Sequence, residues 1–88
     1  MADKVELYGD RRCPVCQVAR NFFMKKGIHF VDYDIDKDEN ARRRFNIMIK
    51  MMNVKPGVPL VVIYGQKLHG FNEQKYQAAL NSKKTGLK

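Results

Sequence analysis

Two cysteines are the residues of this 88-residue chain best suited to chemistry, and they are its only cysteines. They stand three positions apart in the segment Cys13-Pro14-Val15-Cys16. A disulfide between them closes a loop too short to restrict much of the unfolded chain, so it contributes little as a structural bridge. Thiol–disulfide exchange instead requires an accessible thiolate with a second thiol close by, and this spacing supplies both. The pair therefore predicts redox chemistry.

The sequence around Cys13 places its sulfur at the start of a helix. Residues 4–8 alternate polar and apolar side chains and predict a strand, and residues 9–12 form a connecting loop. A helix is expected to begin at Cys13. Pro14 suits its first turn, because the N–H that proline lacks has no intrahelical partner there.

This position favours a negatively charged sulfur. Unpaired backbone N–H groups and the helix dipole stabilise an anion at a helix N-terminus, and Arg11 and Arg12 add positive charge nearby. Environments of this kind lower the pKa of a cysteine. We therefore predict that Cys13 is the attacking thiolate and that Cys16, one turn later and partly beneath it, is the resolving thiol.

Metal binding is an alternative use of the pair. A structural zinc site normally has four ligands, and the two histidines, His29 and His69, show no spacing that predicts convergence on the cysteines. We assign no metal ligand within the chain. An iron–sulfur cluster needs two further ligands from a second subunit or from bound thiols. A non-catalytic module that holds a cluster or a partner therefore stays open as a second class of function.

The first half of the chain after Cys13 predicts a helix, a strand and a second helix. Gly27 is suited to end the first helix, and residues 28–35 contain the strand. Asp36 or Asp38 opens the second helix, and Asp36-x-x-Glu39 resembles a capping box. The apolar residues expected in these three elements are Val15, Val18, Ala19, Phe22 and Phe23, then Phe30, Val31 and Tyr33, then Ala41, Phe45, Met48 and Met52.

The second half predicts a hairpin and a final helix. A loop over residues 53–59 precedes a nearly continuous apolar run at 60–64, which predicts a buried strand. Gly65-Gln66 fits a two-residue turn of the Gly-X kind, with a short return strand at 67–69. Asn72 is expected to cap a last helix that carries Tyr76, Ala79 and Leu80.

The elements in order are β-α-β-α-β-β-α, which predicts an α/β fold with a mixed four-stranded sheet flanked by three helices. The first βαβ unit should have parallel strands, and the hairpin adds an antiparallel pair. Residues 1–88 form one domain, with an ordered core over about 4–80 and a basic tail at 81–88.

The formal net charge of +8 invites acidic or anionic partners. No aromatic-interleaved patch or recognised motif accompanies it, and Arg42-Arg43-Arg44 spreads around a helix, so nucleic-acid binding is not favoured. No apolar run is long enough to span a membrane, and the N-terminus lacks the apolar stretch of a secretory signal. We expect a cytoplasmic monomer without a membrane partner.

Four markers taken together resemble the glutaredoxin family from about Lys4 to Leu80. They are Tyr8 five residues before Cys13, Cys13-Pro14-Val15-Cys16 opening a helix, Gly57-Val58-Pro59, and Gly70-Phe71-Asn72-Glu73. The resemblance implies a thioredoxin fold, a cis peptide bond before Pro59, and Cys13 as the nucleophile. It also implies a Val58 backbone free to pair with an extended substrate. Position alone would not predict the cis bond, because few X–Pro bonds are cis.

The resemblance also implies glutathione as electron donor, with no cofactor bound, and disulfide-containing or glutathionylated proteins as partners. The family often has a basic residue three positions before the first cysteine, where this chain has Asp10. The glutathione-binding residues that we predict are Arg11, Arg12, Lys55, Val58, Pro59, Gly70, Asn72 and Glu73.

Two departures leave other relatives open. Val15 replaces the aromatic residue usual in the family's cysteine motif, and His69-Gly70 replaces its Gly-Gly. These departures resemble glutaredoxin-like redoxins that take electrons from thioredoxin reductase. Arsenate-reductase-like regulators share a similar opening, but their chains are usually longer, so they are ranked lower.

Overall fold

The computed structural model describes residues 4–85, with side chains described through residue 82. Seven elements follow one another in the expected order: β1 (Val5–Gly9), α1 (Pro14–Lys25), β2 (Val31–Asp34), α2 (Glu39–Met52), β3 (Leu60–Ile63), β4 (Gln66–His69) and α3 (Glu73–Thr85). Within this part of the chain, no helix combines the length and the apolar character needed to cross a membrane.

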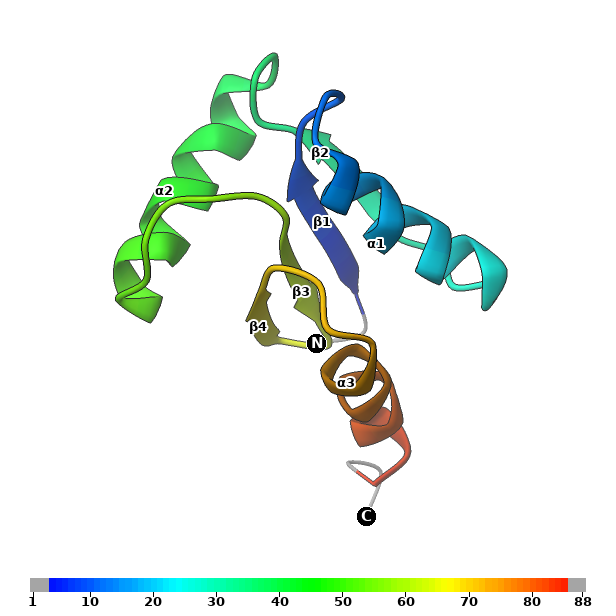
Figure 1. Cartoon of the computed structure of the whole chain (residues 1–88). Helices are drawn as coiled ribbons and strands as arrows, with labels where there is room; N and C mark the ends of the chain where they lie inside the picture. Colours follow the sequence, from blue (N-terminus) through cyan, green and yellow to red (C-terminus); the bar gives the residue numbers. More distant parts are fainter. Residues whose placement is uncertain (1–3, 86–88) are drawn as a thin grey trace.

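The four strands form one mixed sheet in the order β2-β1-β3-β4. Strand β1 runs parallel to β2 and antiparallel to β3, and β4 runs antiparallel to β3 (Figure 1). The parallel pair and the antiparallel hairpin that the sequence predicted are both confirmed.

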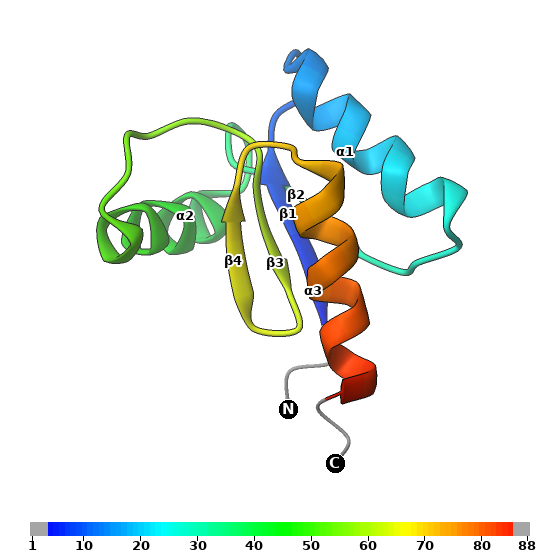
Figure 2. The same cartoon turned by 60° about the horizontal axis from the view of Figure 1, so that its bottom comes forward.

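Helices α1 and α3 cover one face of the sheet and α2 covers the other (Figure 2). Alternate residues of a strand point to opposite faces, so β1 and β3 contribute to both cores. The core under α1 and α3 contains Val5, Leu7, Ala19, Phe22, Phe23, Val61, Ile63, Tyr76 and Ala79. The core under α2 contains Tyr8, Ala41, Phe45, Ile49 and Leu60.

Helix α1 begins and ends where its sequence predicts. Pro14 is its first residue and Cys13 is its N-cap. At the other end Gly27 has φ +68°, which a residue with a side chain rarely adopts. Its N–H donates to the Met24 carbonyl at 3.1 Å, and the Ile28 N–H donates to the Phe23 carbonyl at 2.9 Å. These bonds satisfy carbonyls of the last turn.

The turn between β3 and β4 differs from the prediction by one residue. Ile63 pairs with Gln66, so Tyr64 and Gly65 are the two central residues instead of Gly65 and Gln66. Both have positive φ, 50° at Tyr64 and 90° at Gly65, as a type I′ turn requires. The twist of this turn matches that of the strands, which favours it although Tyr64 is not a glycine.

The start of α2 is at the second of the two proposed aspartates. Asp38 is the N-cap, and its Oδ1 accepts the N–H of Ala41 at 3.1 Å. The capping box from Asp36 is therefore wrong. Asp36 lies in the preceding turn, where its own N–H donates to Asp34 Oδ1 at 2.9 Å.

The last helix is longer than expected, because α3 extends to Thr85 and not to about residue 80. The part of the predicted basic tail at residues 86–88 lies outside the described residues.

The three consecutive arginines of α2 point to different partners, as the helical spacing predicted. The side chain of Arg42 donates to the Ile35 carbonyl at 3.0 Å, Arg43 donates to Glu39 Oε2 at 3.4 Å, and Arg44 donates to the Tyr8 hydroxyl at 3.2 Å. They do not form one cationic patch for a single ligand.

Candidate redox site

Cys13 lies between the end of β1 and the first turn of α1. Its backbone is extended (φ −84°, ψ 111°), the conformation of an N-cap residue. Its Sγ accepts the backbone N–H of Cys16 at 3.1 Å. The sulfur thus takes the place that an N-cap oxygen usually fills, and one of the free N–H groups of the helix points at it. This arrangement stabilises negative charge on Cys13 Sγ.

Cys16 is fully buried behind Cys13. The pKa of the Cys16 thiol is raised to about 12, mainly by burial and also by its hydrogen bond with Cys13 and the negative charge of that residue. Two groups oppose this shift: a backbone hydrogen bond from Asp10 and the positive charge of Arg20. The two cysteines therefore have different environments, one partly exposed at a helix start and one enclosed.

Gly9, the last residue of β1, makes room for the buried sulfur. A Cβ atom placed on Gly9 would lie 2.6 Å from Cys16 Sγ and 3.2 Å from Cys16 Cβ. Real Cβ atoms do not approach other heavy atoms so closely, so α1 packs on the end of β1 only because this residue is glycine. Gly9 was expected in a loop, and this contact was not predicted.

The peptide bond between Val58 and Pro59 is cis, as the resemblance implied. The Cys13 thiol faces the Val58 carbonyl oxygen across 3.8 Å, so this loop lies beside the exposed sulfur. Among the described residues, no hydrogen bond is recorded for the Val58 N–H. The loop therefore presents backbone groups next to Cys13 that an extended chain could use.

The turn between β4 and α3 is attached to the cis-proline loop. The N–H of Gly70 donates to the Pro59 carbonyl at 2.8 Å, and the Gly70 carbonyl accepts the Tyr76 hydroxyl at 2.5 Å. Gly70 has φ +84°, the left-handed region that favours glycine. Cys13, Val58, Pro59 and Gly70 are thus brought together from three separate parts of the chain.

Asn72 caps α3, as predicted. Its Oδ1 accepts the N–H of Lys75 at 3.0 Å. The Asn72 side chain is therefore engaged with its own helix, and Glu73 lies exposed in the first turn of α3. Their roles toward glutathione stay predictions.

The predicted basic residues are less concentrated than expected. Arg11 is 79% exposed and lies 3.9 Å from an Asp34 carboxylate oxygen. Arg12 is exposed, and its backbone N–H donates to Asp10 Oδ1 at 2.8 Å. Lys55 lies exposed in the loop before Pro59, and within residues 4–85 no hydrogen bond or ion pair is recorded for it. Acidic neighbours therefore reduce the positive potential that Arg11 and Arg12 add near Cys13.

Two further side chains lie near the site, Arg20 and His69, and the sequence did not predict the contacts that they make there. Arg20 bonds the Asp10 carbonyl at 3.1 Å and Asp32 at 2.9 Å. His69 Nε2 lies 3.2 Å from the Gly57 carbonyl oxygen and donates to it in the Nε2–H tautomer. In the sequence, His69 is weighed as a zinc ligand and as part of the His69-Gly70 pair that replaces the family's Gly-Gly. In the described part of the chain, no group of three or more histidine, cysteine or acidic side chains is arranged so that it could hold a metal ion.

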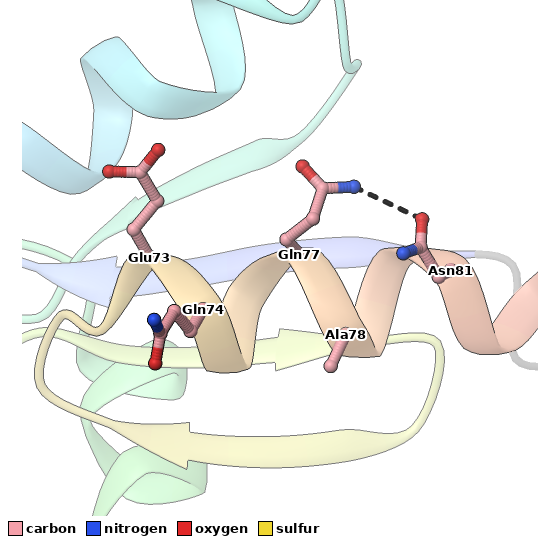
Figure 3. Close-up of a pocket in the computed structure, with 5 residues that line it drawn as sticks. All are labelled: Glu73, Gln74, Gln77, Ala78 and Asn81. Carbon is pink, nitrogen blue, oxygen red and sulfur yellow. Dashed lines mark hydrogen bonds between the residues drawn. The ribbon is translucent and has the colours of Figure 1, made fainter.

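Three surface depressions lie around α1 and α3, and neither cysteine lines any of them. A charged one of about 430 Å³ is lined by Arg11, Gln17, Arg20, Asp32 and Asp34. A mixed groove of about 300 Å³ between α1 and α3 is lined by Val18, Asn21, Phe22, Lys25, Phe71 and Glu73. Figure 3 shows a third, on the outer side of α3, lined by Glu73, Gln74, Gln77, Ala78 and Asn81. In this third depression the Gln77 side chain donates to Asn81 Oδ1 at 3.1 Å.

A mixed four-stranded sheet, a cysteine pair at the start of α1 and a cis-proline loop beside it define a redox protein of the thioredoxin fold. Residues 5–68 match the sequence model of the Glutaredoxin family. A probable glutaredoxin from Synechocystis sp. is 33% identical over 70 residues, which cover 80% of this chain and 76% of that protein. The chain therefore belongs to the glutaredoxin family.

Solved structures agree with this assignment. A mutant of a thioredoxin-like protein superposes with a TM-score of 0.75 at 31% identity, over 89% of this chain and 95% of that one. A glutaredoxin from Archaeoglobus fulgidus superposes with a TM-score of 0.74 at 26% identity, over 89% of this chain and 86% of that one. The predicted fold class and the resemblance to the family are thus confirmed.

Proposed function

We propose that this protein is a thiol–disulfide oxidoreductase that reduces protein disulfides or glutathione mixed disulfides through a Cys13/Cys16 dithiol cycle. One observation carries the proposal most directly. Cys13 Sγ caps α1, accepts the Cys16 N–H at 3.1 Å, and faces the Val58 carbonyl of the cis-proline loop. A sulfur held in this way has a stabilised anionic form and an adjacent strand of backbone to which a substrate can pair.

In the first step the Cys13 thiolate attacks one sulfur of the substrate disulfide. A bond forms between Cys13 Sγ and that sulfur, and the substrate disulfide bond breaks. The displaced sulfur leaves with the electron pair and takes a proton from water. The 3.8 Å contact between the Cys13 thiol and the Val58 carbonyl is weak, so little is lost when the thiol ionises.

In the second step Cys16 attacks Cys13 Sγ and releases the reduced substrate, leaving a Cys13–Cys16 disulfide. The first step prepares this one. The charge of Cys13 and its hydrogen bond both raise the pKa of Cys16, and both disappear once Cys13 is bound to substrate. Burial still opposes ionisation of Cys16, whereas the Asp10 backbone and Arg20 still favour it.

Glutathione is the electron donor that we propose, with thioredoxin reductase as the alternative. For a glutathionylated substrate, glutathione can also resolve the mixed disulfide directly, without Cys16. Free N–H groups at the start of α3 suit a carboxylate, and Glu73 in that turn suits an amino group.

The test is a pair of reduction assays with wild type, Cys13→Ser and Cys16→Ser. One assay supplies glutathione with its reductase, and the other supplies thioredoxin reductase. Cys13→Ser should lose turnover in both. Cys16→Ser should lose reduction of a protein disulfide but keep removal of glutathione from a glutathionylated protein. Full activity in Cys13→Ser would refute the proposed function, and turnover with thioredoxin reductase alone would reassign the donor.

A further inference from the structure

Arg20 is a charged side chain held almost completely inside the structure beside the redox pair. It lies one helical turn after Cys16 on α1, and its side chain is 12% exposed. Three polar groups surround its guanidinium: Nε donates to Asp32 Oδ2 at 2.9 Å, one terminal nitrogen donates to the Asp10 carbonyl at 3.1 Å, and the other donates to Gln17 Oε1 at 3.3 Å. The planar fork of an arginine holds such partners in a fixed geometry.

These contacts connect Arg20 to the Cys16 sulfur in two ways. The backbone of Asp10 forms a hydrogen bond with Cys16, and the carbonyl of the same residue accepts from Arg20. Residues four apart on a helix also lie on the same helix face, and the positive charge of Arg20 favours the ionised form of Cys16. Within the described residues, the buried side chains that carry a polar group belong to cysteine or tyrosine, and no charged side chain is fully buried. A buried carboxylate that could take the Cys16 proton is therefore absent from this part of the chain.

We infer, building on the proposed function, that Arg20 is a positioning residue for the resolving step: it holds the Asp10 backbone against Cys16 and places a positive charge beside that sulfur. In this step the Cys16 thiolate attacks Cys13 Sγ, the bond from Cys13 to the partner sulfur breaks, and the partner leaves as a thiolate that takes a proton from water. Arg20 increases the fraction of Cys16 present as the attacking thiolate.

The size of the effect follows from two opposing changes. Each unit by which the pKa of Cys16 rises on loss of the Arg20 charge lowers the thiolate fraction about tenfold. A more basic thiolate is also a better nucleophile, and a Brønsted coefficient of about 0.4–0.5 returns roughly threefold of that loss. The resolving step should therefore slow by a net factor of about three for each unit of the rise, and attack by Cys13 should not change.

The two steps can be measured separately with an aromatic disulfide, 5,5′-dithiobis(2-nitrobenzoate). Attack by Cys13 on this probe releases one coloured thiolate, and attack by Cys16 on the resulting mixed disulfide releases a second. Stopped-flow mixing of the reduced protein with one equivalent of the probe gives both rates. Arg20→Met should slow the second release at neutral pH, leave the first unchanged, and displace the pH profile of the second release upward, with about threefold slowing for each pH unit of that displacement.

Three matched variants separate charge from structure. Arg20→Lys keeps the charge and should restore most of the second rate. Asp32→Asn removes the ion pair but keeps the Arg20 charge, so its second release should be as fast as that of wild type or faster. Arg43→Met removes a charge from an exposed pair on α2 and should leave both releases unchanged.

The inference is overturned if Arg20→Met keeps the wild-type second rate, if it slows both releases equally, or if Asp32→Asn reproduces it. Failure of the proposed function looks different. In that case wild type gives no fast first release, or Cys13→Ser gives the same first release as wild type.

Discussion

The two faces of the sheet use their polar groups in opposite ways. On the face covered by α2, Tyr8 and Tyr33 stack with ring centres 4.8 Å apart, and the Arg44 guanidinium lies 4.8 Å from the Tyr33 ring centre. The Arg44 Nε donates to the Tyr8 hydroxyl at 3.2 Å, and that hydroxyl donates to Glu6 at 3.4 Å. These side chains therefore stack on and hydrogen-bond to one another.

On the face covered by α1 and α3, the polar groups near Cys13 belong mainly to the backbone. Cys13 Sγ meets the Cys16 N–H at 3.1 Å and the Val58 carbonyl at 3.8 Å. The core behind them is largely aromatic, with Phe22, Phe23, Phe71 and Tyr76 in mutual ring contact. The Tyr8 hydroxyl is bonded to two side chains, whereas the contact of Cys13 Sγ with the Val58 carbonyl is long and weak, so a substrate can displace it. Tyr8, a marker of the family resemblance, has a structural role on the opposite face.

Alkaline pH should reveal the difference between the faces most strongly. Burial raises the pKa of Cys16 to about 12, whereas an exposed cysteine titrates near about 8.5. Above about pH 8.5 the unfolded chain loses this proton and the folded protein keeps it. The free energy of unfolding of the reduced protein should therefore fall by about 1.4 kcal/mol per pH unit, or roughly 3 kcal/mol over two units, until about pH 12. Urea unfolding in the presence of reductant measures this slope.

The oxidised protein is the matched control, because its Cys16 has no proton to lose. Burial also raises the pKa of Tyr8 and of Tyr76, so both forms should lose some stability at high pH. The slope of the oxidised form should be smaller by about 1.4 kcal/mol per pH unit. Equal slopes would mean that Cys16 ionises as readily in the folded protein as in the unfolded chain.

Gly9→Ala should destabilise the packing of α1 on the end of β1, beside Cys16. The added Cβ would lie 2.6 Å from Cys16 Sγ, so α1 or the Cys16 side chain must shift. We expect the free energy of unfolding to fall by about 1–3 kcal/mol, the usual cost of overpacking. The second thiolate release should slow, because Cys16 is displaced. Gly57→Ala is the control: its Cβ would make an ordinary 3.5 Å contact with His69, so a stability change within about 1 kcal/mol is expected. Equal losses in the two variants would contradict this packing argument.

The order of the elements could be predicted because each depends on a local pattern. Pro14 and Gly27 mark the ends of α1, Asn72 caps α3, and the apolar run at 60–64 predicts β3. The errors concern choices that local patterns leave open. Asp36 and Asp38 are both adequate caps by residue type, and the structure uses Asp38 while Asp36 lies in the preceding turn. The hairpin register is set by pairing of Ile63 with Gln66, which no dipeptide preference reveals.

The parts of the site that could be predicted are those whose residues lie close together in the sequence. Cys13 and Cys16 were identified from their own motif, and the cis bond before Pro59 was implied by the family resemblance. Arg20 was missed because its role depends on Asp10 and Asp32, which approach it only when β1, β2 and α1 are packed together. Gly9 was missed for the same reason, since its importance lies in a contact with Cys16 seven residues later.

Tyr76→Phe tests the link between the aromatic core and the cis-proline loop. The Tyr76 hydroxyl donates to the Gly70 carbonyl, and Gly70 in turn donates to Pro59. Loss of the hydroxyl keeps the ring contacts and removes one buried hydrogen bond, so the free energy of unfolding should fall by about 1 kcal/mol. Tyr33→Phe on the α2 face removes a bond to Glu6 of 3.5 Å and should cost less. Thermal and urea unfolding of both variants measure the difference, and a larger loss in Tyr33→Phe would reverse the comparison.

Arg44→Met should change the free energy of unfolding least, and it tests whether the two faces of the sheet are independent. It removes the cation above the two tyrosine rings at an exposed position, where such contacts contribute about 0.5–1 kcal/mol to the free energy of unfolding. Arg43→Met, whose pair with Glu39 is exposed, should change that free energy by about 0.5 kcal/mol or less. Both variants should release the two aromatic thiolates at wild-type rates, because the α2 face supplies no group to the cysteines. A slower first release in Arg44→Met, but not in Arg43→Met, would show that the packing of Tyr8 affects attack by Cys13. The two faces of the sheet would then be coupled through β1.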